Sequence, residues 1–300
     1  MLTALVSAKS DGVTTSATAM ALASSRPVLL AELDLSGGTL RHGLLRHAPS
    51  GEGRVLDGRI GLHRLPRADW ARGESESLAP AVDENLWPLD GSDSRVVLPG
   101  LTSPAQAPSL AHTWPELINV MQLSDQQHGF DVLADCGRLV VDRGRLHAEL
   151  NPVQVLQQAD VVLLVVRTTE ASVALAHPAV QVLRQELTAG DDAALGLLVI
   201  EDGTYPAQEV ADALGVALRA VLPFEPREAD YVTAGGHPPR GFIRSKLMRA
   251  ARSYGDQVRE HAHRRRLHIR MGAAQAMSPQ VASVAQRVAA QRGAGVRSHG

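Results

Sequence analysis

The chain has 300 residues, of which 44% are hydrophobic and 21% charged, and its formal net charge is −2. This composition is ordinary for a globular protein, and so small a net charge gives no general attraction to nucleic acid or membranes. A single cysteine, Cys136, excludes an intrachain disulfide and a zinc site built from cysteines, and it is typical of the reducing cytoplasm. We expect neither a signal peptide nor a transmembrane segment, because no basic residues precede the first apolar stretch and no apolar run approaches the ~18 residues of a membrane span.

Short, nearly continuous apolar segments recur along the chain, separated by stretches with helical character. Such segments are typical of strands buried on both faces of a sheet. The six clearest lie at 2–6, 28–33, 131–134, 161–166, 195–200 and 218–222. Between them we expect helices at 14–24, 114–127, 171–187, 206–214 and 241–264. This alternation predicts an α/β fold with a doubly wound, mostly parallel sheet between two layers of helices.

Two regions depart from this alternation. Residues 36–110 are rich in Gly, Pro, Ser and charged residues, and we expect an irregular insertion there, with further strands open at 60–65 and 96–98. The second region begins at Arg259 and is basic before it ends in GAGVRSHG. We therefore expect one domain over residues 1–258, followed by a basic helical extension and a disordered tail over 259–300.

The stretch Ser7–Thr15, SAKSDGVTT, has the form of a phosphate-binding loop between the first strand and the first helix. In such loops the backbone N–H groups and the helix dipole attract phosphate, and a Ser or Thr hydroxyl binds Mg²⁺. Gly12 supplies the turn and Thr14 follows it, but Val13 stands where a lysine normally reaches the β- and γ-phosphates. Taken alone, the motif is equally well explained by a tight strand-to-helix turn.

A carboxylate follows each of the next two strands of the predicted core. Asp34 lies within Glu32–Gly38, and Asp135 ends the buried stretch FDVLAD. Ligands of doubly wound sheets bind at the carboxyl ends of the strands. We therefore expect Asp34 to position a water molecule, and Asp135, acting through water, to help Thr14 hold Mg²⁺. The alternative is that each carboxylate caps a turn or a helix.

Together these motifs resemble the deviant Walker A ATPases of the MinD/ParA superfamily. Their loop reads K-G-G-x-G-K-T-T and is followed by D-x-D at the second strand and D-x-x at the third. The resemblance spans residues 1–251 and includes the stretches 159–169 and 218–236, the second of which contacts the base in these proteins. It implies a P-loop NTPase-like α/β/α fold that binds ATP or ADP with Mg²⁺. The degenerate loop is most similar to the CpaE/TadZ branch, which positions pilus and secretion machinery.

The resemblance also implies roles for individual residues. It implies that Asp34 and Lys9 are catalytic residues. Aligned on Gly12, the loop has Ala8 at the signature-lysine position; aligned on Lys9, it is one residue shorter than usual. Lys9 then either crosses a dimer interface to the partner's nucleotide or folds back to replace the missing charge. The implied nucleotide contacts are Lys9, Ser10, Asp11, Gly12, Val13, Thr14 and Thr15 in the loop, and Pro223 and Glu225 after the last strand.

Two substitutions weaken the implied site. Loss of the lysine–phosphate contact at Val13 costs roughly 1.5–3 kcal/mol, or about one to two orders of magnitude in affinity. Hydrolysis loses more, because the lysine also stabilises charge that develops in the transition state. Asp11 adds a negative charge to a loop that binds anions, while Glu32 replaces the first Asp of D-x-D conservatively. We therefore expect nucleotide binding with at most weak ATP hydrolysis.

The expected function is that of an ATP-binding or pseudo-ATPase regulatory factor that localises a pilus, secretion or partitioning assembly. It is expected to act as a homodimer in the cytoplasm, at the inner face of the membrane or at the cell pole. One alternative is an active ParA-like ATPase that binds nonspecific DNA as an ATP dimer through Lys9 and a basic surface such as residues 264–266. Another is an interaction scaffold that holds no nucleotide. For Arg259–Arg270 we favour a solvated helix face, and for Cys136 a packed core thiol.

Overall fold

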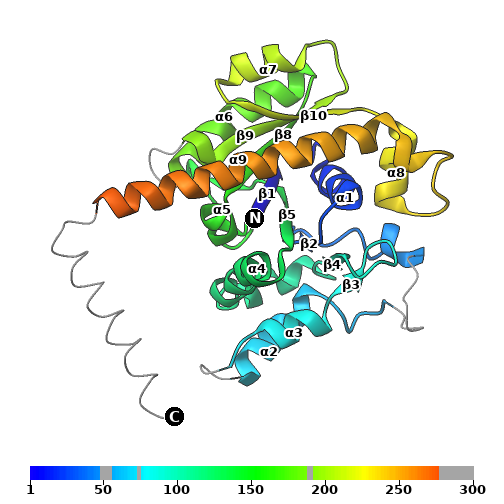
Figure 1. Ribbon diagram of the computed structural model, residues 1–300, viewed down its shortest axis with the longest axis vertical. Coiled ribbons are helices and arrows are strands. Elements are labelled where there is room, and N and C mark those ends of the chain that lie inside the picture. The colour runs from blue at the N-terminus through cyan, green and yellow to red at the C-terminus, as the bar shows by residue number, and fades with distance from the viewer. Residues whose placement is uncertain (48–55, 73–75, 188–191, 277–300) are drawn as a thin grey trace, which may run out of the picture.

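The computed structural model describes residues 1–47, 56–72, 76–187 and 192–276 (Figure 1). Its main sheet has eight strands in the order β10-β9-β8-β1-β5-β2-β4-β3, and every neighbouring pair is parallel except β3 and β4. The strands are β1 (Leu2–Ser7), β2 (Val28–Glu32), β3 (Trp87–Pro88), β4 (Arg95–Leu98), β5 (Asp131–Arg138), β8 (Val161–Arg167), β9 (Leu195–Glu201) and β10 (Leu218–Pro223). The predicted α/β fold with a mostly parallel sheet is confirmed.

Helices cover both faces of this sheet (Figure 1). One face packs against α1 (Val13–Ala23), α8 (Pro226–Ala234) and α9 (Lys246–Ala276). The other face packs against α2 (Leu65–Arg72), α3 (Ala79–Glu84), α4 (Trp114–His128), α5 (Val153–Gln158), α6 (Glu170–Glu186) and α7 (Ala207–Leu214). A separate two-stranded hairpin, β6 (Val141–Asp142) and β7 (Arg145–Leu146), follows β5.

The central strand β1 shows why the apolar segments are continuous. Ala4 and Val6 belong to the core beneath α4 and α6, whereas Leu5 belongs to the core beneath α1 and α9, and all three are fully buried. Successive side chains of a strand point to opposite faces, so a strand covered by helices on both sides favours apolar residues in both directions; Thr3 and Ser7 are the buried polar exceptions in β1.

The region 36–110 is more regular than the sequence indicated. The strand expected at 96–98 is confirmed as part of β4, which pairs with β2 inside the main sheet. The strand expected at 60–65 is wrong, because a 3-10 turn at Leu62–Arg64 leads there directly into α2. Its two fully buried side chains, Leu62 and Leu65, are three residues apart, which suits a helical segment and not a strand.

Helix α9 is longer than the sequence indicated. It begins at Lys246, after a 3-10 turn at Phe242–Arg244, and it continues to Ala276. One uninterrupted helix therefore crosses the boundary expected at position 258, and the disordered tail expected at the end of 259–300 lies outside the described residues. Over the described residues, no helix combines the length and the apolar character that a membrane span requires.

Candidate functional site

The loop between β1 and α1 places Gly12 directly before the first turn of α1. Gly12 has a left-handed φ of +93°, and a Cβ there would lie 3.1 Å from Ile200 Cδ1. Both facts favour glycine at this position. No side chain caps α1, so within the described structure the first N–H groups of the helix have no side-chain acceptor. These groups and the helix dipole together form a place where an anion is stabilised.

Within this loop the only cationic side chain is Lys9, which is exposed. Val13, which stands at the expected lysine position, is only 4% exposed and belongs to the same buried cluster as Leu5 and Ile200. Ser10 adopts a left-handed φ of +56°. The valine is therefore an integral part of the core, and the charge of a phosphate-contacting lysine is missing from the first turn of α1.

Asp135 is completely buried and close to Thr14. The sequence predicts that it follows a strand ending at position 134, but β5 continues to Arg138, so Asp135 lies within the strand. Its Oδ1 accepts a hydrogen bond from Gly137 N at 3.1 Å, whereas Oδ2 has no hydrogen-bond partner among the described residues. The pKa of this carboxyl is raised to about 7, chiefly by burial; the Thr14 hydroxyl acts against this rise, and the nearby charges of Glu32 and Asp34 contribute to it. A buried carboxylate with an unpartnered oxygen is an arrangement that a cation would stabilise.

Asp34 follows β2 and lies close to Asp135 of the neighbouring strand β5, as expected. Its Oδ1 accepts hydrogen bonds from Ser36 N at 2.8 Å and from Ser36 Oγ at 2.6 Å. A Cβ on Gly137 would lie 2.2 Å from Asp34 Cγ, so the carboxyl group rests directly against the backbone that follows Asp135. The structure thus brings Thr14, Asp34 and Asp135 together at one edge of the sheet.

Glu32, the counterpart of the first Asp of D-x-D, has a different position. It is 1% exposed, and its Oε1 accepts from Thr39 N at 2.6 Å and Leu40 N at 2.9 Å. Its Oε2 accepts from Gly100 N at 2.8 Å. Three backbone donors therefore engage this carboxylate, which ties the loop after β2 to the loop after β4.

Asp11 is also engaged inside the protein. It is 6% exposed, its Oδ2 accepts a 2.7 Å hydrogen bond from Ser172 Oγ, and its N–H donates to Ser7 Oγ at 3.2 Å. The negative charge that the sequence places in the loop is thus bonded to the first turn of α6. Sequence reasoning missed Ser172, which has no local signal because 161 positions separate it from Asp11.

The predicted nucleoside contacts, Pro223 and Glu225, line a small pocket beside Gly12 and Thr15. The available volume of this pocket is about 40 Å³, which suits one or two water molecules and not a purine. Glu225 Oε2 accepts a 2.8 Å hydrogen bond from Leu247 N, so its carboxylate holds the start of α9.

Two residues that sequence reasoning missed form another wall of this pocket. The guanidinium carbon of Arg167 lies 5.3 Å from the centre of the Phe224 ring, and Arg167 also pairs with Asp202. The sequence could have pointed to these residues only through their place at the ends of strands: Arg167 is the last residue of β8, and Phe224 directly follows β10. Thr14, Asp135 and the N–H groups at the start of α1 are groups that suit Mg²⁺ and phosphate, whereas this pocket of about 40 Å³ is too small for a base.

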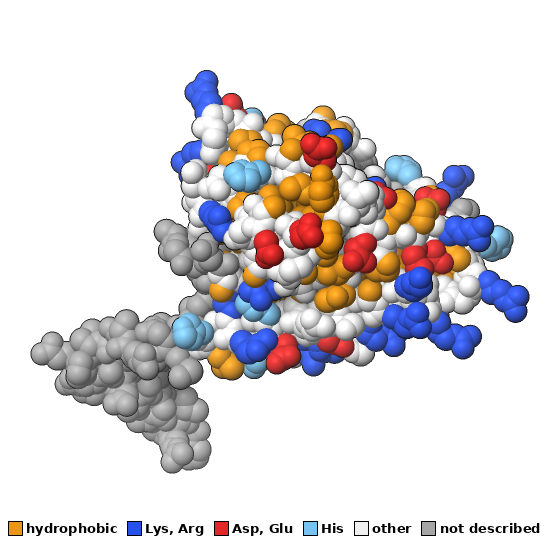
Figure 2. All heavy atoms as spheres, turned by 90° about the horizontal axis from the view of Figure 1, so that it is seen from above, with side chains coloured by type: hydrophobic (Ala, Val, Ile, Leu, Met, Phe, Trp, Pro, Cys, Tyr) orange, Lys and Arg blue, Asp and Glu red, His pale blue; other side chains and the backbone are white. Residues whose placement is uncertain are grey.

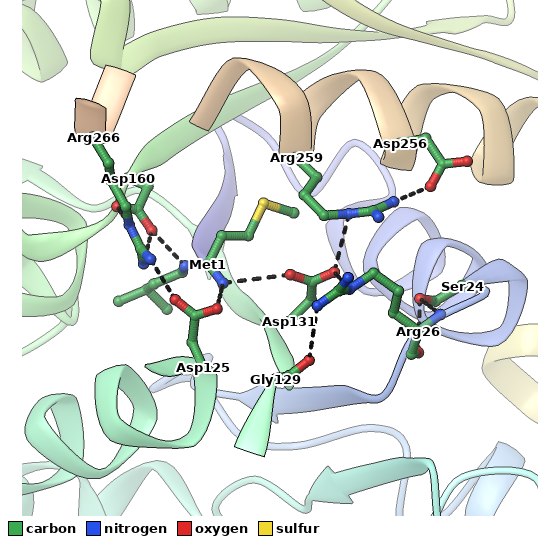
Figure 3. A network of polar contacts seen from close by, with 11 residues as sticks. Met1, Ser24, Arg26, Asp125, Gly129, Asp131, Asp160, Asp256, Arg259 and Arg266 are labelled. Atoms are coloured by element: carbon green, nitrogen blue, oxygen red, sulfur yellow. Dashed lines mark hydrogen bonds and ion pairs between the residues drawn. The ribbon is translucent and has the colours of Figure 1, made fainter. Parts of the chain in front are cut away.

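The basic segment of α9 is partly used to hold the helix on the protein (Figure 3). Arg266 pairs with Asp125 and Asp160, and Arg259 Nε lies 3.2 Å from Asp131 Oδ2. Desolvation opposes the charge of Arg266, but the two carboxylates hold the pKa of its guanidinium above the ordinary value.

These contacts change the interpretation of the cluster. The favoured solvated helix face is correct for Arg264, which is 68% exposed, but wrong for Arg259 and Arg266, whose side chains are only 27% exposed. The cause is the acidic edge formed by Asp125, Asp131 and Asp160, which are far apart in sequence. The side chain of Arg270 lies outside the described part of the chain.

Cys136 is 2% exposed, and burial raises the pKa of its thiol well above the ordinary value, with Asp135 and Asp34 acting in the same direction. A thiol held in its neutral form this strongly is a poor nucleophile. The interpretation of Cys136 as a packed core residue agrees with this environment.

Comparison with known proteins gives matches among solved structures alone. No protein-family model matches the chain, and no curated protein sequence matches it. MinD from Pyrococcus horikoshii, solved with Mg-ADP, aligns with a TM-score of 0.60 and 18% identity, over 88% of this chain and 98% of that chain. A ParA family ATPase from Chlorobium tepidum gives a TM-score of 0.58 and 16% identity, over 84% and 97%.

A third similar structure is the MinC:MinD cell division complex of Aquifex aeolicus, with a TM-score of 0.56, 15% identity and coverage of 87% and 96%. At these identities the similarity concerns the fold. It extends over nearly the whole length of each solved chain. The chain therefore has the fold of the MinD and ParA ATPases.

Proposed function

We propose that this protein binds a Mg²⁺-nucleotide weakly at the loop of residues 9–15 and acts as a nucleotide-responsive localisation factor. The observation that carries the proposal is Oδ2 of Asp135, which has no hydrogen-bond partner among the described residues and is buried close to Thr14, at the start of a helix without a side-chain cap. Mg²⁺ would supply the missing positive charge, held by Thr14 and, through water, by Asp135. The backbone N–H groups of residues 12–14 would hold the phosphates.

Slow or absent hydrolysis follows from the same loop. Val13 leaves no lysine to stabilise charge on the transferred phosphoryl group, and Lys9, the remaining loop cation, is exposed. Asp34 would orient a water molecule, but orientation without charge stabilisation accelerates hydrolysis little. Nucleotide binding, and not hydrolysis, would then change the state of the protein.

A dimer or partner face is proposed at the carboxyl edge of the sheet. Three large apolar side chains that follow strands there are exposed: Val141 (46%), Tyr205 (43%) and Phe224 (40%). Exposed apolar groups close to a ligand loop suit an interface whose formation depends on the ligand. The proposed partners are a second copy of this chain and components of a pilus, secretion or partitioning assembly, in the cytoplasm, at the inner membrane face or at the cell pole.

A nucleotide-free scaffold is the second candidate, favoured by the small volume of the pocket beside Gly12. The active ParA-like alternative receives less support, because Arg266 is engaged with Asp125 and Asp160 and is not free for DNA. Filter binding of radiolabelled ATP, together with phosphate release, separates the cases. Retention of ATP without phosphate release supports the proposal, no retention supports the scaffold, and ATP-dependent, salt-sensitive DNA binding supports the ParA-like alternative.

A further inference from the structure

A second and larger pocket lies at the opposite end of α1 from Gly12. It has a volume of about 580 Å³, within the range of small-molecule sites, and Leu22 in the last turn of α1 forms part of its lining. Because α1 has 11 residues, about 16 Å of helix separates this pocket from the phosphate-binding loop. The two sites therefore share no lining residue, and nothing in the proposed nucleotide function accounts for the second.

The floor of this pocket is apolar. It is lined by Leu22 of α1, by Leu44 and Leu89 from region 36–110, and by Phe242 and Met248 at and after the turn that precedes α9. Tyr231 packs edge-on against Phe242, with 4.7 Å between the ring centres, and keeps the aromatic wall in place. Burial raises the pKa of the Tyr231 hydroxyl, and the charge of Asp90 adds to this effect, so the hydroxyl stays a neutral hydrogen-bond group in the pocket.

The rim is positively charged. Arg244 and Arg252 both line the pocket and are exposed, and within the described residues neither forms an ion pair. Asp90 is the one carboxylate in the described lining, and Arg95 Nη1 neutralises it at 2.8 Å. Figure 2 shows Lys and Arg side chains gathered at the end of the molecule that carries α8. The chain from Tyr231 to Gly255 contains five Lys or Arg residues and no Asp or Glu: Arg240, Arg244, Lys246, Arg249 and Arg252.

We propose that this pocket binds a small amphipathic anion. A carboxylate or phosphate head would be held by Arg244 and Arg252, and an unbranched or cyclic apolar body would lie against Phe242 and Met248. An apolar floor selects the body by removing it from water, and unpaired guanidinium groups select an anionic head. The concave form and the volume favour a free amphiphile over a lipid that remains within a bilayer.

The test is isothermal titration calorimetry of the full chain with ligands kept below their micelle concentrations. Decanoate and decyl phosphate are expected to bind, decanol at least about tenfold more weakly, and decyltrimethylammonium not at all. Hexanoate is also expected to bind at least about tenfold more weakly than decanoate, because it buries fewer methylene groups. Failure of decanoate and decyl phosphate to bind at millimolar concentration overturns the proposal, as does equal binding of decanol.

Variants at the rim assign the binding to this pocket. Arg244→Gln and Arg252→Gln are each expected to weaken decanoate binding by about fivefold or more, whereas Arg249→Gln, on the same helix as Arg252 but outside the lining, leaves it unchanged. Arg252 Nε also donates to Ala23 O at 3.1 Å, so Arg244→Gln, which removes no hydrogen bond within the described structure, is the variant that isolates the ligand effect. Unchanged binding in Arg244→Gln and Arg252→Gln overturns the proposal.

Two control experiments distinguish binding in this pocket from binding at the phosphate-binding loop and from binding to a bilayer surface. Thr14→Ala is expected to retain decanoate binding, which keeps the result independent of the nucleotide site; loss of binding in this folded variant overturns the assignment to the pocket. Vesicles that contain phosphatidylglycerol provide the bilayer control. Binding to such vesicles by a protein that takes up neither free anion replaces the pocket with a membrane-docking surface and overturns the proposal.

Discussion

Ser172 Oγ donates a 2.7 Å hydrogen bond to Asp11 Oδ2, and it accepts one from Arg167 N at 2.9 Å. One hydroxyl thus connects the loop after β1, the end of β8 and the first turn of α6. The loop that would hold phosphate is therefore shaped by a contact that its own sequence does not contain.

Ser172→Ala is expected to lower the free energy of unfolding by about 1–3 kcal/mol, because it leaves a buried Asp11 oxygen without its donor. Urea denaturation measures the effect. The matched control is the same substitution in an Asp11→Ala background, where the cost should fall to the part caused by the lost acceptor of Arg167 N. An equal cost in both backgrounds would show that this hydrogen bond is not the cause.

Arg266→Ala is expected to destabilise the protein by roughly 2–3 kcal/mol, because Asp125 and Asp160 lose their shared cation while 16% and 12% exposed. Arg264→Ala is the control two positions away. Arg264 is 68% exposed and lies 4.0 Å from Glu260, so its removal should cost less than about 0.5 kcal/mol. Urea denaturation measures both losses of unfolding free energy. Similar losses in the two variants would show that the ion pairs of Arg266 with Asp125 and Asp160 do not stabilise the fold.

Val13→Lys restores a lysine at this position and tests its effect on folding stability and on nucleotide binding. Without nucleotide the variant is expected to melt at a lower temperature, because Val13 is 4% exposed and an ammonium group there is poorly solvated. With Mg·ATP the variant should gain more stability than the wild type, since the triphosphate can pair with the new charge. Val13→Met controls for size without charge; an equal gain in Val13→Met would show that the added charge is not the cause.

The raised pKa of Asp135 makes the free energy of unfolding depend on pH in the absence of Mg²⁺. Its folded pKa of about 7 lies above the unfolded value of about 3.9, so the folded state retains a proton that the unfolded state releases between these values. The contribution of this carboxyl to stability is therefore fully present below about pH 4 and declines as pH rises toward 7. Asp135→Asn lacks this decline and should gain stability relative to the wild type between pH 5 and pH 8. Parallel curves of unfolding free energy against pH for the wild type and Asp135→Asn would show that Asp135 does not have a raised pKa in the folded state.

The fold could be predicted from the sequence because its strands carry a strong local signal. β1 and β8 are covered by helices on both faces, so most residues in them are apolar, and their predicted positions are correct to within one residue. Region 36–110 has a weaker signal because its elements are short. β3 has two residues, and the buried pair Leu62 and Leu65 suits a helix as readily as a strand when only the sequence is considered.

The convergence of Asp34 and Asp135 could be predicted because Asp34 follows β2 and Asp135 lies in the neighbouring parallel strand β5, opposite the last residue of β2. The roles of Glu32, Ser172 and Arg266 could not, because each depends on a partner more than 60 positions away: Gly100, Asp11 and Asp125. A carboxylate or an arginine has the same local sequence signal whether it binds a ligand or holds two loops together.

The most direct test of the central proposal is the melting temperature of the protein during titration with Mg·ATP. A protein that binds only in the folded state gains about 1.4 kcal/mol at ten times the dissociation constant, so even weak binding becomes visible at millimolar ligand. The proposal predicts a rising melting temperature for the wild type and no rise for Thr14→Ala. A wild-type protein that shows no rise at millimolar Mg·ATP, or a Thr14→Ala variant with the wild-type rise, would contradict it.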